Sequence, residues 1–495
     1  MEFANQNITS EGVCLVDNKQ FAVDCRISEL VDENVAKILC LDAASIIDGY
    51  DLLNGEVKFK GKINYKLMYV DENGEVKALN YLCDFSDSIL SKELSSTDKI
   101  CLEATVTSCS SSGLDIIKLS AIVFVKVIKV CMDSVEVIEA NDDNCYYKTE
   151  EISYNSFVTA SVSSFEIEDE YQTAKPIDDI LMYDTDVLLC DVTPSENKIM
   201  LSGDVNANVT YKTEGGIATK TFNVPFSEEI EGANTPEGQC VCKLNIADAK
   251  VILGDNDSTI KIKLAIDARC MIFEANEVKI VNDMYSMTNR LELKKEKITI
   301  QNILGYKCFS ERIATEAVLD NNMTGNIISV VCPKNSVEKV TVEDNILTAA
   351  GTVTACLLYR QEDKVNSVAL KAPYSVELGE VEDGDWQIEG TVTEITAKAK
   401  NENVIALDAL LKFACKGKNY TEYEAVVSAE DKGELPEKDC AISIIVISRP
   451  LMFFDVAKQL ATTPEELSRQ NPSLIEPLKL GDKLYFYRKL KQSYC

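Results

Sequence analysis

Residues 61–69 read GKINYKLMY, and the same skeleton returns at 203–211 as GDVNANVTY and at 351–359 as GTVTACLLY. In each copy a glycine is followed eight residues later by a tyrosine, with apolar residues at every second position between them. This period-two alternation predicts a β-strand with one buried face. The copies begin 142 and 148 residues apart, which is the length of a domain and too long for a solenoid repeat.

The surroundings of the three copies agree with one another. An isoleucine in an apolar cluster lies 23 residues before each glycine, at Ile38, Ile180 and Ile328. An aromatic residue followed by serine lies 15 or 16 residues after each tyrosine, at 85–86, 226–227 and 374–375. We therefore predict an internal triplication, which is defined by six structural residues: Gly61, Tyr69, Gly203, Tyr211, Gly351 and Tyr359.

Several short alternating runs joined by polar turns make up each copy, and they favour an antiparallel sandwich or barrel-like domain. The sequence thus predicts a mainly β protein with three such domains in tandem, the first with an N-terminal extension, at 1–135, 150–290 and 297–430. A weakly similar block precedes each isoleucine, and its pattern fits either an added strand or a short helix. In a strand the shared tyrosine would pack its ring and direct its hydroxyl to water or a partner at the rim.

The composition narrows the classes of function. The chain has 495 residues and a formal net charge of −31, which argues against nucleic acid as a partner because phosphate binding needs a basic surface. We expect no membrane span, since no apolar run reaches about 20 residues. The beginning of the chain lacks the basic start and apolar core of a signal peptide, so we expect the protein to stay in the compartment where it is made.

The chain has 18 cysteines and no histidine. A Ser-His-Asp triad, a Cys-His dyad and a Cys2His2 zinc site therefore cannot be built from it. We expect most cysteines to be small buried apolar residues. With no phosphate-binding glycine loop and no cluster of metal ligands in the sequence, we predict a protein without enzymatic activity, cofactor or metal.

The last part of the chain, 441–490, has a different character. From 441 onward there are eight Lys or Arg and five Asp or Glu, so a basic segment follows an acidic body. A strand-like run is followed by FFDVAKQL, in which Phe453, Val456, Ala457 and Leu460 form one helical stripe. Thr463 and Pro464 are suited to cap and begin a second helix, and a last strand follows the turn at 481–482. The predicted order of a small α+β domain is strand, helix, helix, strand.

The Gly-to-Tyr strands, the later PFS segment at 225–227 and the closing strands resemble the SPOCS domain of spore-forming Firmicutes over roughly 12–430. The final segment resembles a LysM domain, in the matches at 455–457, 463–467, 471–472 and 480–484. In this combination the chain is similar to a family of clostridial spore coat morphogenetic proteins. The resemblance implies a non-enzymatic scaffold or adaptor in the mother-cell cytoplasm, at the forespore surface and in the spore coat.

The resemblance also implies that the LysM-like domain binds the coat morphogenetic ATPase. Exposed strand edges of the repeats would allow either self-association or docking of other coat proteins by edge pairing. LysM domains that bind N-acetylglucosamine polymers usually carry Gly-Asp-Thr in the loop after the first strand, where this chain has Pro450, Leu451 and Met452. Apolar residues there suit a protein groove better than a glycan. The candidate partner-binding residues are Pro450, Leu451, Met452, Phe454, Lys458, Lys479 and Lys483. The alternatives are a peptidoglycan- or chitin-type glycan site and plain packing of the loop.

Overall fold

The computed structural model describes residues 3–27, 35–114, 116–141, 144–234, 238–320, 322–436 and 442–488. The protein is mainly β, with several antiparallel sheets, which confirms this part of the predicted fold class. None of the helices in these residues has the length and apolar character that a membrane crossing requires.

Three stretches of the chain share one connectivity, and we name them repeat 1 (5–138), repeat 2 (145–286) and repeat 3 (289–434). Each begins with one long strand: β1 (Asn5–Ile27), β7 (Cys145–Gln172) and β12 (Asn289–Val318). The block that fitted either a strand or a helix lies in these strands over 21–27, 165–172 and 309–318. Each repeat ends with a hairpin: β5 (Ile100–Ser112) with β6 (Ile117–Ile138), β10 (Gln239–Leu253) with β11 (Thr259–Ser286), and β16 (Asp385–Ala399) with β17 (Val404–Glu434). The second hairpin strand pairs with the first strand of its repeat, which gives the sheets β1-β6-β5, β7-β11-β10 and β12-β17-β16.

The middle of each repeat forms a second sheet. In repeats 1 and 3 it is a three-stranded meander, built from β2 (Val35–Leu53), β3 (Glu56–Asp71) and β4 (Val76–Leu90), and from β13 (Asn326–Glu343), β14 (Ile346–Gln361) and β15 (Lys364–Glu380). In repeat 2 the long β8 (Asp179–Thr213) pairs with β9 (Gly216–Asn234). The carbonyl of Leu188 lies against Gly203, so the first half of β8 runs beside its second half, in the place that β2 and β13 occupy.

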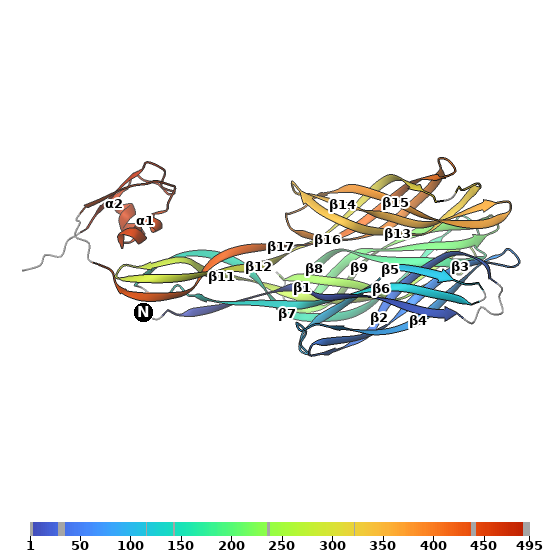
Figure 1. The fold of residues 1–495 in the computed structure, drawn as a ribbon, viewed down its shortest axis with the longest axis horizontal. Coiled ribbons are helices and arrows are strands. Elements are labelled where there is room, and N and C mark those ends of the chain that lie inside the picture. The colour runs from blue at the N-terminus through green and yellow to red at the C-terminus, as the bar shows by residue number, and fades with distance from the viewer. Residues whose placement is uncertain are drawn as a thin grey trace, which may run out of the picture.

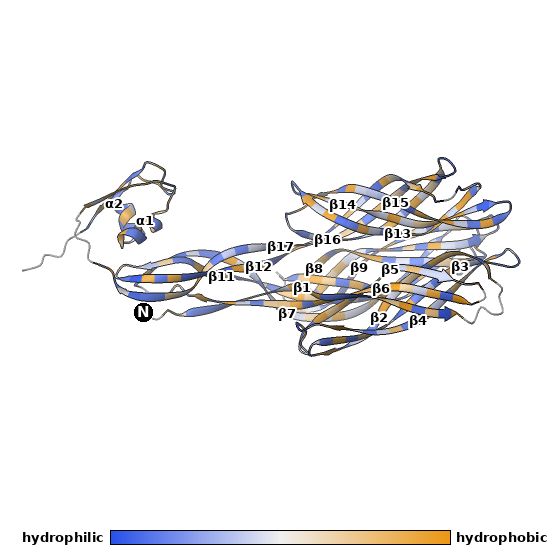
Figure 2. Ribbon diagram, in the orientation of Figure 1, coloured by the Kyte–Doolittle hydropathy of each residue, from blue (hydrophilic) through white to orange (hydrophobic). Residues whose placement is uncertain are grey.

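The two sheets of each repeat enclose an apolar core. Strands from both sheets supply it, as with Val23, Phe59 and Val123 in repeat 1. Corresponding clusters fill repeat 2 and repeat 3. Figure 2 shows the alternation of hydrophobic and hydrophilic residues along these strands. The pattern that predicts half-buried strands therefore matches the way the sandwiches are packed.

The first and last strands of each repeat continue beyond the sandwiches as two-stranded ribbons. The ribbons are 5–12 with 131–138, 145–156 with 274–286, and 289–303 with 418–434. Figure 1 shows the sandwiches gathered at one end of an elongated molecule, with the ribbons extending from them toward the C-terminal helices. We call this extension the stalk. Its interior contains buried residues from all three ribbons: Ile8, Val137, Ile152, Ile280, Ile298, Ile300 and Ala425.

The meander sheets of the three repeats also pack against one another. Their outer faces share an apolar junction that contains Leu39, Cys40, Met68, Leu181, Met182, Val331 and Leu358. Beside it, the Nζ of Lys66 donates to the carbonyl of Tyr183 at 2.6 Å and lies 3.6 Å from Asp184 Oδ1. Lys334 forms an ion pair with Asp42. Side chains from all three repeats therefore stabilise one buried interface.

This junction corrects one expectation from the sequence. The strand 61–69 has one buried face as predicted, since Gly61, Ile63, Tyr65, Leu67 and Tyr69 are buried. However, Lys66 and Met68 on the opposite face are buried too, with exposed fractions of 5% and 0%. The other repeats cover this second face, and a single strand's alternation cannot show that.

Candidate functional site

Residues 442–488, the C-terminal module, contain β18 (Ile442–Val446), α1 (Phe453–Leu460), α2 (Pro464–Gln470) and β19 (Lys483–Tyr487). The strands pair antiparallel, with Ile442 opposite Tyr487 and Val446 opposite Lys483. Helix α1 buries Phe453, Val456, Ala457 and Leu460, which confirms the predicted stripe.

The helix starts follow from the local sequence. Thr463 is the N-cap of α2, and its hydroxyl accepts a hydrogen bond from the Glu466 backbone N–H at 2.9 Å. Pro464 occupies the first turn, as predicted. At the start of α1 the carboxylate of Asp455 accepts from the Met452 N–H at 2.9 Å.

The outer face of the β18–β19 sheet is exposed and apolar. It consists of five side chains that are between 40% and 60% exposed: Ile442, Ile444, Val446, Tyr485 and Tyr487. Lys483 is also exposed and stands on the same face of β19, next to Val446 across the strand pair. We call these five residues the β18–β19 face. A contiguous apolar patch of this kind marks an interaction surface, whereas single exposed hydrophobic residues are common and carry no such meaning.

The predicted loop 450–452 lies beside α1 and is already hydrogen-bonded within the module. The Leu451 N–H donates to the Leu478 carbonyl at 3.3 Å, and the Leu478 N–H donates back to the Leu451 carbonyl at 2.8 Å. The Phe453 N–H donates to the carboxylate of Glu476. Pro450 is exposed, Leu451 is partly buried and Met452 is 37% exposed. The backbone N–H groups of Leu451, Met452 and Phe453 thus all donate within the module.

Two predicted partner-binding residues contact the stalk. The ring of Phe454 packs edge-on against Tyr285, with ring centroids 5.2 Å apart. The Nζ of Lys458 lies 2.6 Å from the Asp283 carboxylate. The hydroxyl of Tyr285 also donates to the carbonyl of Thr462 at 2.7 Å. Phe454 and Lys458 therefore hold the module on the end of β11.

The other two predicted cations remain on the surface of the module. Lys479 and Lys483 are both exposed. Lys479 precedes the turn that leads into β19, where its backbone N–H donates to Asp482 at 2.7 Å. Lys483 borders the β18–β19 face, so a positive charge lies at the edge of the apolar patch.

The six repeat-defining residues occupy equivalent strands. Each glycine pairs with the aromatic residue of the neighbouring strand: Gly61 with Phe85, Gly203 with Phe226, and Gly351 with Tyr374. Of the tyrosines, Tyr69 and Tyr211 are buried, with exposed fractions of 2% and 7%, and Tyr359 is partly buried. These residues contribute to the cores of the sandwiches.

Two of the cysteines form a disulfide, Cys190–Cys308, which joins β8 of repeat 2 to β12 of repeat 3. Of the fourteen free cysteines in the described residues, seven are buried and seven are partly buried, so the expectation that most are buried holds for only half of them. Within the residues that the structure describes, no three His, Cys, Asp or Glu side chains are grouped to hold a metal ion.

The fold places this chain in the class of mainly β proteins built from several antiparallel sheets. Two stretches of the chain, 34–113 and 176–253, match the family model described as "SipL, SPOCS domain". These stretches cover corresponding elements, β2 to β5 in repeat 1 and β8 to β10 in repeat 2. The matches support a SipL-like family for this chain and imply a role related to sporulation and the spore coat.

The matched ranges do not include repeat 3 or the C-terminal module. A search of curated proteins found no match, and a search of solved structures found none either.

Proposed function

We propose that this protein is a non-enzymatic scaffold or adaptor of spore coat assembly. Its body would consist of three SPOCS-like domains, and its C-terminal module would be a LysM-like domain that binds a protein partner. The partner would be the coat morphogenetic ATPase, which the protein would tether at the forespore surface from the mother-cell cytoplasm. Repeat 3 supports the triplication, because its sheet β12-β17-β16 has the same strand order as β1-β6-β5 and β7-β11-β10 in the two matched repeats.

The observation that carries the proposal is the β18–β19 face. The face combines aliphatic and aromatic side chains that are between 40% and 60% exposed with a cation at its edge, Lys483. Interface cores are enriched in such residues, whereas isolated surface hydrophobes are not informative. A partner surface of apolar side chains bordered by carboxylates would complement it.

The docked position of the module leaves this face accessible. The contacts with the stalk come from Phe454 and Lys458 of α1 and from Thr462, the second residue after this helix. The exposed strands β18 and β19 make up the other part of the module. The partner would therefore bind while the module stays attached to Tyr285.

A glycan-binding function is the alternative, and the exposed Tyr485 and Tyr487 favour it, since sugar rings stack on aromatic faces. The loop at 450–452 opposes it, because the N–H groups of Leu451, Met452 and Phe453 already donate within the module. We therefore place protein binding first.

The test is affinity capture of the purified coat morphogenetic ATPase by the full-length protein. Ile444→Glu and Tyr485→Ser should each weaken capture about ten-fold or more, since central apolar anchors dominate interface energies. Val318→Glu, at a side chain that is 75% exposed in repeat 3, is the matched control and should bind as the wild type does. Thermal unfolding of each variant checks that the module is folded.

A parallel sedimentation assay with insoluble peptidoglycan separates the two functions. The adaptor proposal requires that the protein stays in the supernatant while it still captures the ATPase. Co-sedimentation that Tyr485→Ser abolishes, combined with no capture of the ATPase, would establish the glycan-binding alternative instead.

A further inference from the structure

A cavity with a volume of about 350 Å³ lies where the three repeats meet, away from the C-terminal module. Repeat 1 lines it with β5 and the residues before that strand, and repeat 2 lines it with β7, β10 and β11. Lys416 on β17 reaches it from repeat 3. Beneath it, Cys101, Met271 and Phe273 form a buried apolar cluster. A second cavity of about 40 Å³ adjoins the first and shares Glu103, Lys243 and Lys416 with it.

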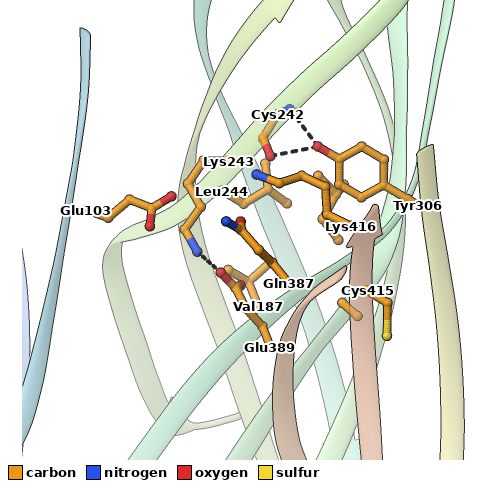
Figure 3. A pocket seen from close by; sticks show the side chains of 12 residues that line it. Glu103, Val187, Cys242, Lys243, Leu244, Tyr306, Gln387, Glu389, Cys415 and Lys416 are labelled. Atoms are coloured by element: carbon orange, nitrogen blue, oxygen red, sulfur yellow. Dashed lines mark hydrogen bonds and ion pairs between the residues drawn. The ribbon is translucent and has the colours of Figure 1, made fainter. Parts of the chain in front are cut away.

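Cationic side chains gather at this cavity, although the protein as a whole is strongly acidic. Lys243, Arg269 and Lys416 all line it. Figure 3 shows Glu103, Lys243 and Lys416 converging from three different strands on the smaller cavity. Lys243 forms an ion pair with Glu389. The charge of Lys243 is therefore matched within the protein.

The charges of Arg269 and Lys416 are not paired with a carboxylate in this way. Neither side chain forms a hydrogen bond or ion pair within the described residues, and the Nε of Arg269 is buried without a partner. A buried donor that lacks an acceptor costs free energy that a bound acceptor would recover. Two carboxylates also line the cavity, those of Asp98 and Glu103. Asp98 lies 3.4 Å from the Nζ of Lys129, whereas Glu103 lies near Lys243 and Lys416.

The electrostatics agree with this geometry. Burial lowers the pKa of Lys416, and the charge of Lys243 lowers it further, against the opposing effects of Glu103 and Glu389. Burial raises the pKa of the Cys101 thiol, while the positive charges of Arg269, Lys243 and Lys416 act to lower it. All three cations thus act on the same thiol, and all of them line the cavity together with it.

The remainder of the wall is largely apolar. Ile100, Val162, Val241 and Met271 line it, and Val162 is 70% exposed at its mouth. A site that combines an apolar wall with a few convergent charged groups is typical of pockets for small molecules. A free phosphate would use the cations but leave the apolar wall without a partner.

We propose that this junction cavity binds a small organic anion, with a carboxylate held by Arg269 and Lys416 and an apolar body against the wall formed by repeats 1 and 2. Because the walls come from separate repeats, the ligand would stabilise their association. This inference does not depend on the proposed function of the C-terminal module.

The experiment is isothermal titration calorimetry of the full-length protein with benzoate, benzylamine and inorganic phosphate as probes. Benzoate should bind saturably with a Kd of about 1 mM or tighter, whereas benzylamine, which has nearly the same shape and the opposite charge, should not bind. Arg269→Gln with Lys416→Gln should weaken benzoate binding about ten-fold or more, because the variant loses both charged donors to the carboxylate. Lys398→Gln, at an exposed lysine of β16, is the control and should leave the affinity unchanged.

Glu103→Gln should change the affinity for benzoate in the opposite direction. A gain in affinity cannot arise from misfolding, so this test holds even if the double variant does not fold. This substitution removes the competing carboxylate and should tighten benzoate binding several-fold. The proposal fails if benzylamine binds as well as benzoate, if neither the double variant nor Glu103→Gln changes the affinity, or if benzoate shows no saturable binding. Phosphate that binds more tightly than benzoate would overturn the assignment of an organic anion.

Discussion

The ring of Phe226 lies directly over Gly203, the residue opposite it on the neighbouring strand, so that a Cβ on Gly203 would come within 2.8 Å of the ring Cζ. The same relationship joins Gly61 to Phe85 at 2.6 Å and Gly351 to the Tyr374 hydroxyl at 2.9 Å. In each repeat a backbone carbonyl also lies against the glycine, from β2 and β13 in repeats 1 and 3 and from the first half of β8 in repeat 2. The glycine is therefore required because an aromatic ring and a carbonyl occupy the space of a side chain.

Replacement of Gly61 by alanine should destabilise repeat 1 by about 2 kcal/mol or more, because neither the ring nor the backbone carbonyl can move aside without disturbing the core. The matched control is Gly49→Ala on the adjacent strand, where the nearest atom to a new Cβ is Lys60 Cε at 3.8 Å. This control should stay within about 0.5 kcal/mol of the wild type. Urea unfolding followed by circular dichroism compares the two, and equal losses would contradict the explanation.

The disulfide between Cys190 and Cys308 should stabilise the association of repeats 2 and 3. Cys190→Ala with Cys308→Ala is expected to lower the free energy of unfolding by about 2–4 kcal/mol. Differential scanning calorimetry with and without a reductant measures the effect. The Tm of the wild-type protein should fall on reduction, whereas that of the double variant should not change. Alkylation before mass spectrometry should identify the same pair in the untreated protein.

Acid should loosen the junction between the repeats through Asp184. Burial opposes the charge of Asp184, but Lys334 and Lys66 outweigh it, so its pKa lies below the usual 3.8 in the folded protein. A lowered pKa means that the ionised carboxylate stabilises the fold fully above the unfolded pKa of about 4. That stabilisation is lost as the pH falls from about 4 through the folded pKa.

Asp184→Asn should cost about 3 kcal/mol at pH 7, because it leaves Lys66 buried without its carboxylate, and it should flatten the fall in stability below pH 4. Unfolding free energies measured from pH 2 to pH 7 test both effects. Asp179→Asn, at an exposed residue of the same strand, should follow the wild-type curve. If the unfolding free energies of Asp184→Asn and the wild type fell in parallel below pH 4, Asp184 would not be the cause of the acid destabilisation.

Tyr285 should be the main attachment point of the C-terminal module. Its ring is buried and contacts the rings of Tyr146 and Phe454. Its hydroxyl donates a hydrogen bond to the Thr462 carbonyl. Tyr285→Ala should release the module and raise amide hydrogen exchange in α1, whereas Tyr285→Phe should cost only about 1 kcal/mol for the lost hydrogen bond. Small-angle scattering should show a wider range of dimensions for the alanine variant alone. An unchanged profile for Tyr285→Ala would mean that other contacts hold the module.

The strands could be predicted from the sequence because alternation is a local property. The pairing of Gly203 with Phe226 could also be detected in the sequence, because a glycine and an aromatic residue recur at nearly the same spacing in each copy. The buried second face at Lys66 and Met68 could not be predicted. It depends on Asp184 and Leu358, which come from other repeats, and no local pattern records that contact.

The candidate site was predicted only in part. Phe454 and Lys458 are an apolar and a cationic residue, as a binding surface would have, but their contacts with Tyr285 and Asp283 join residues 169 and 175 positions apart. The β18–β19 face was missed, although a signal was present in AISIIVIS. Apolar residues occupy both phases of that strand, so one phase fills the module and the other, Ile442, Ile444 and Val446, is left exposed.

The stalk has a mechanical consequence. The C-terminal module follows β17 in the sequence. Strand β17 runs the whole length of the stalk into the body of repeat 3. A pull on the module along this axis loads the ladder between β12 and β17 in shear, so that its many hydrogen bonds resist together instead of opening one at a time. The stalk can thus transmit tension, with little extension, between a partner bound at the C-terminal module and the sandwiches.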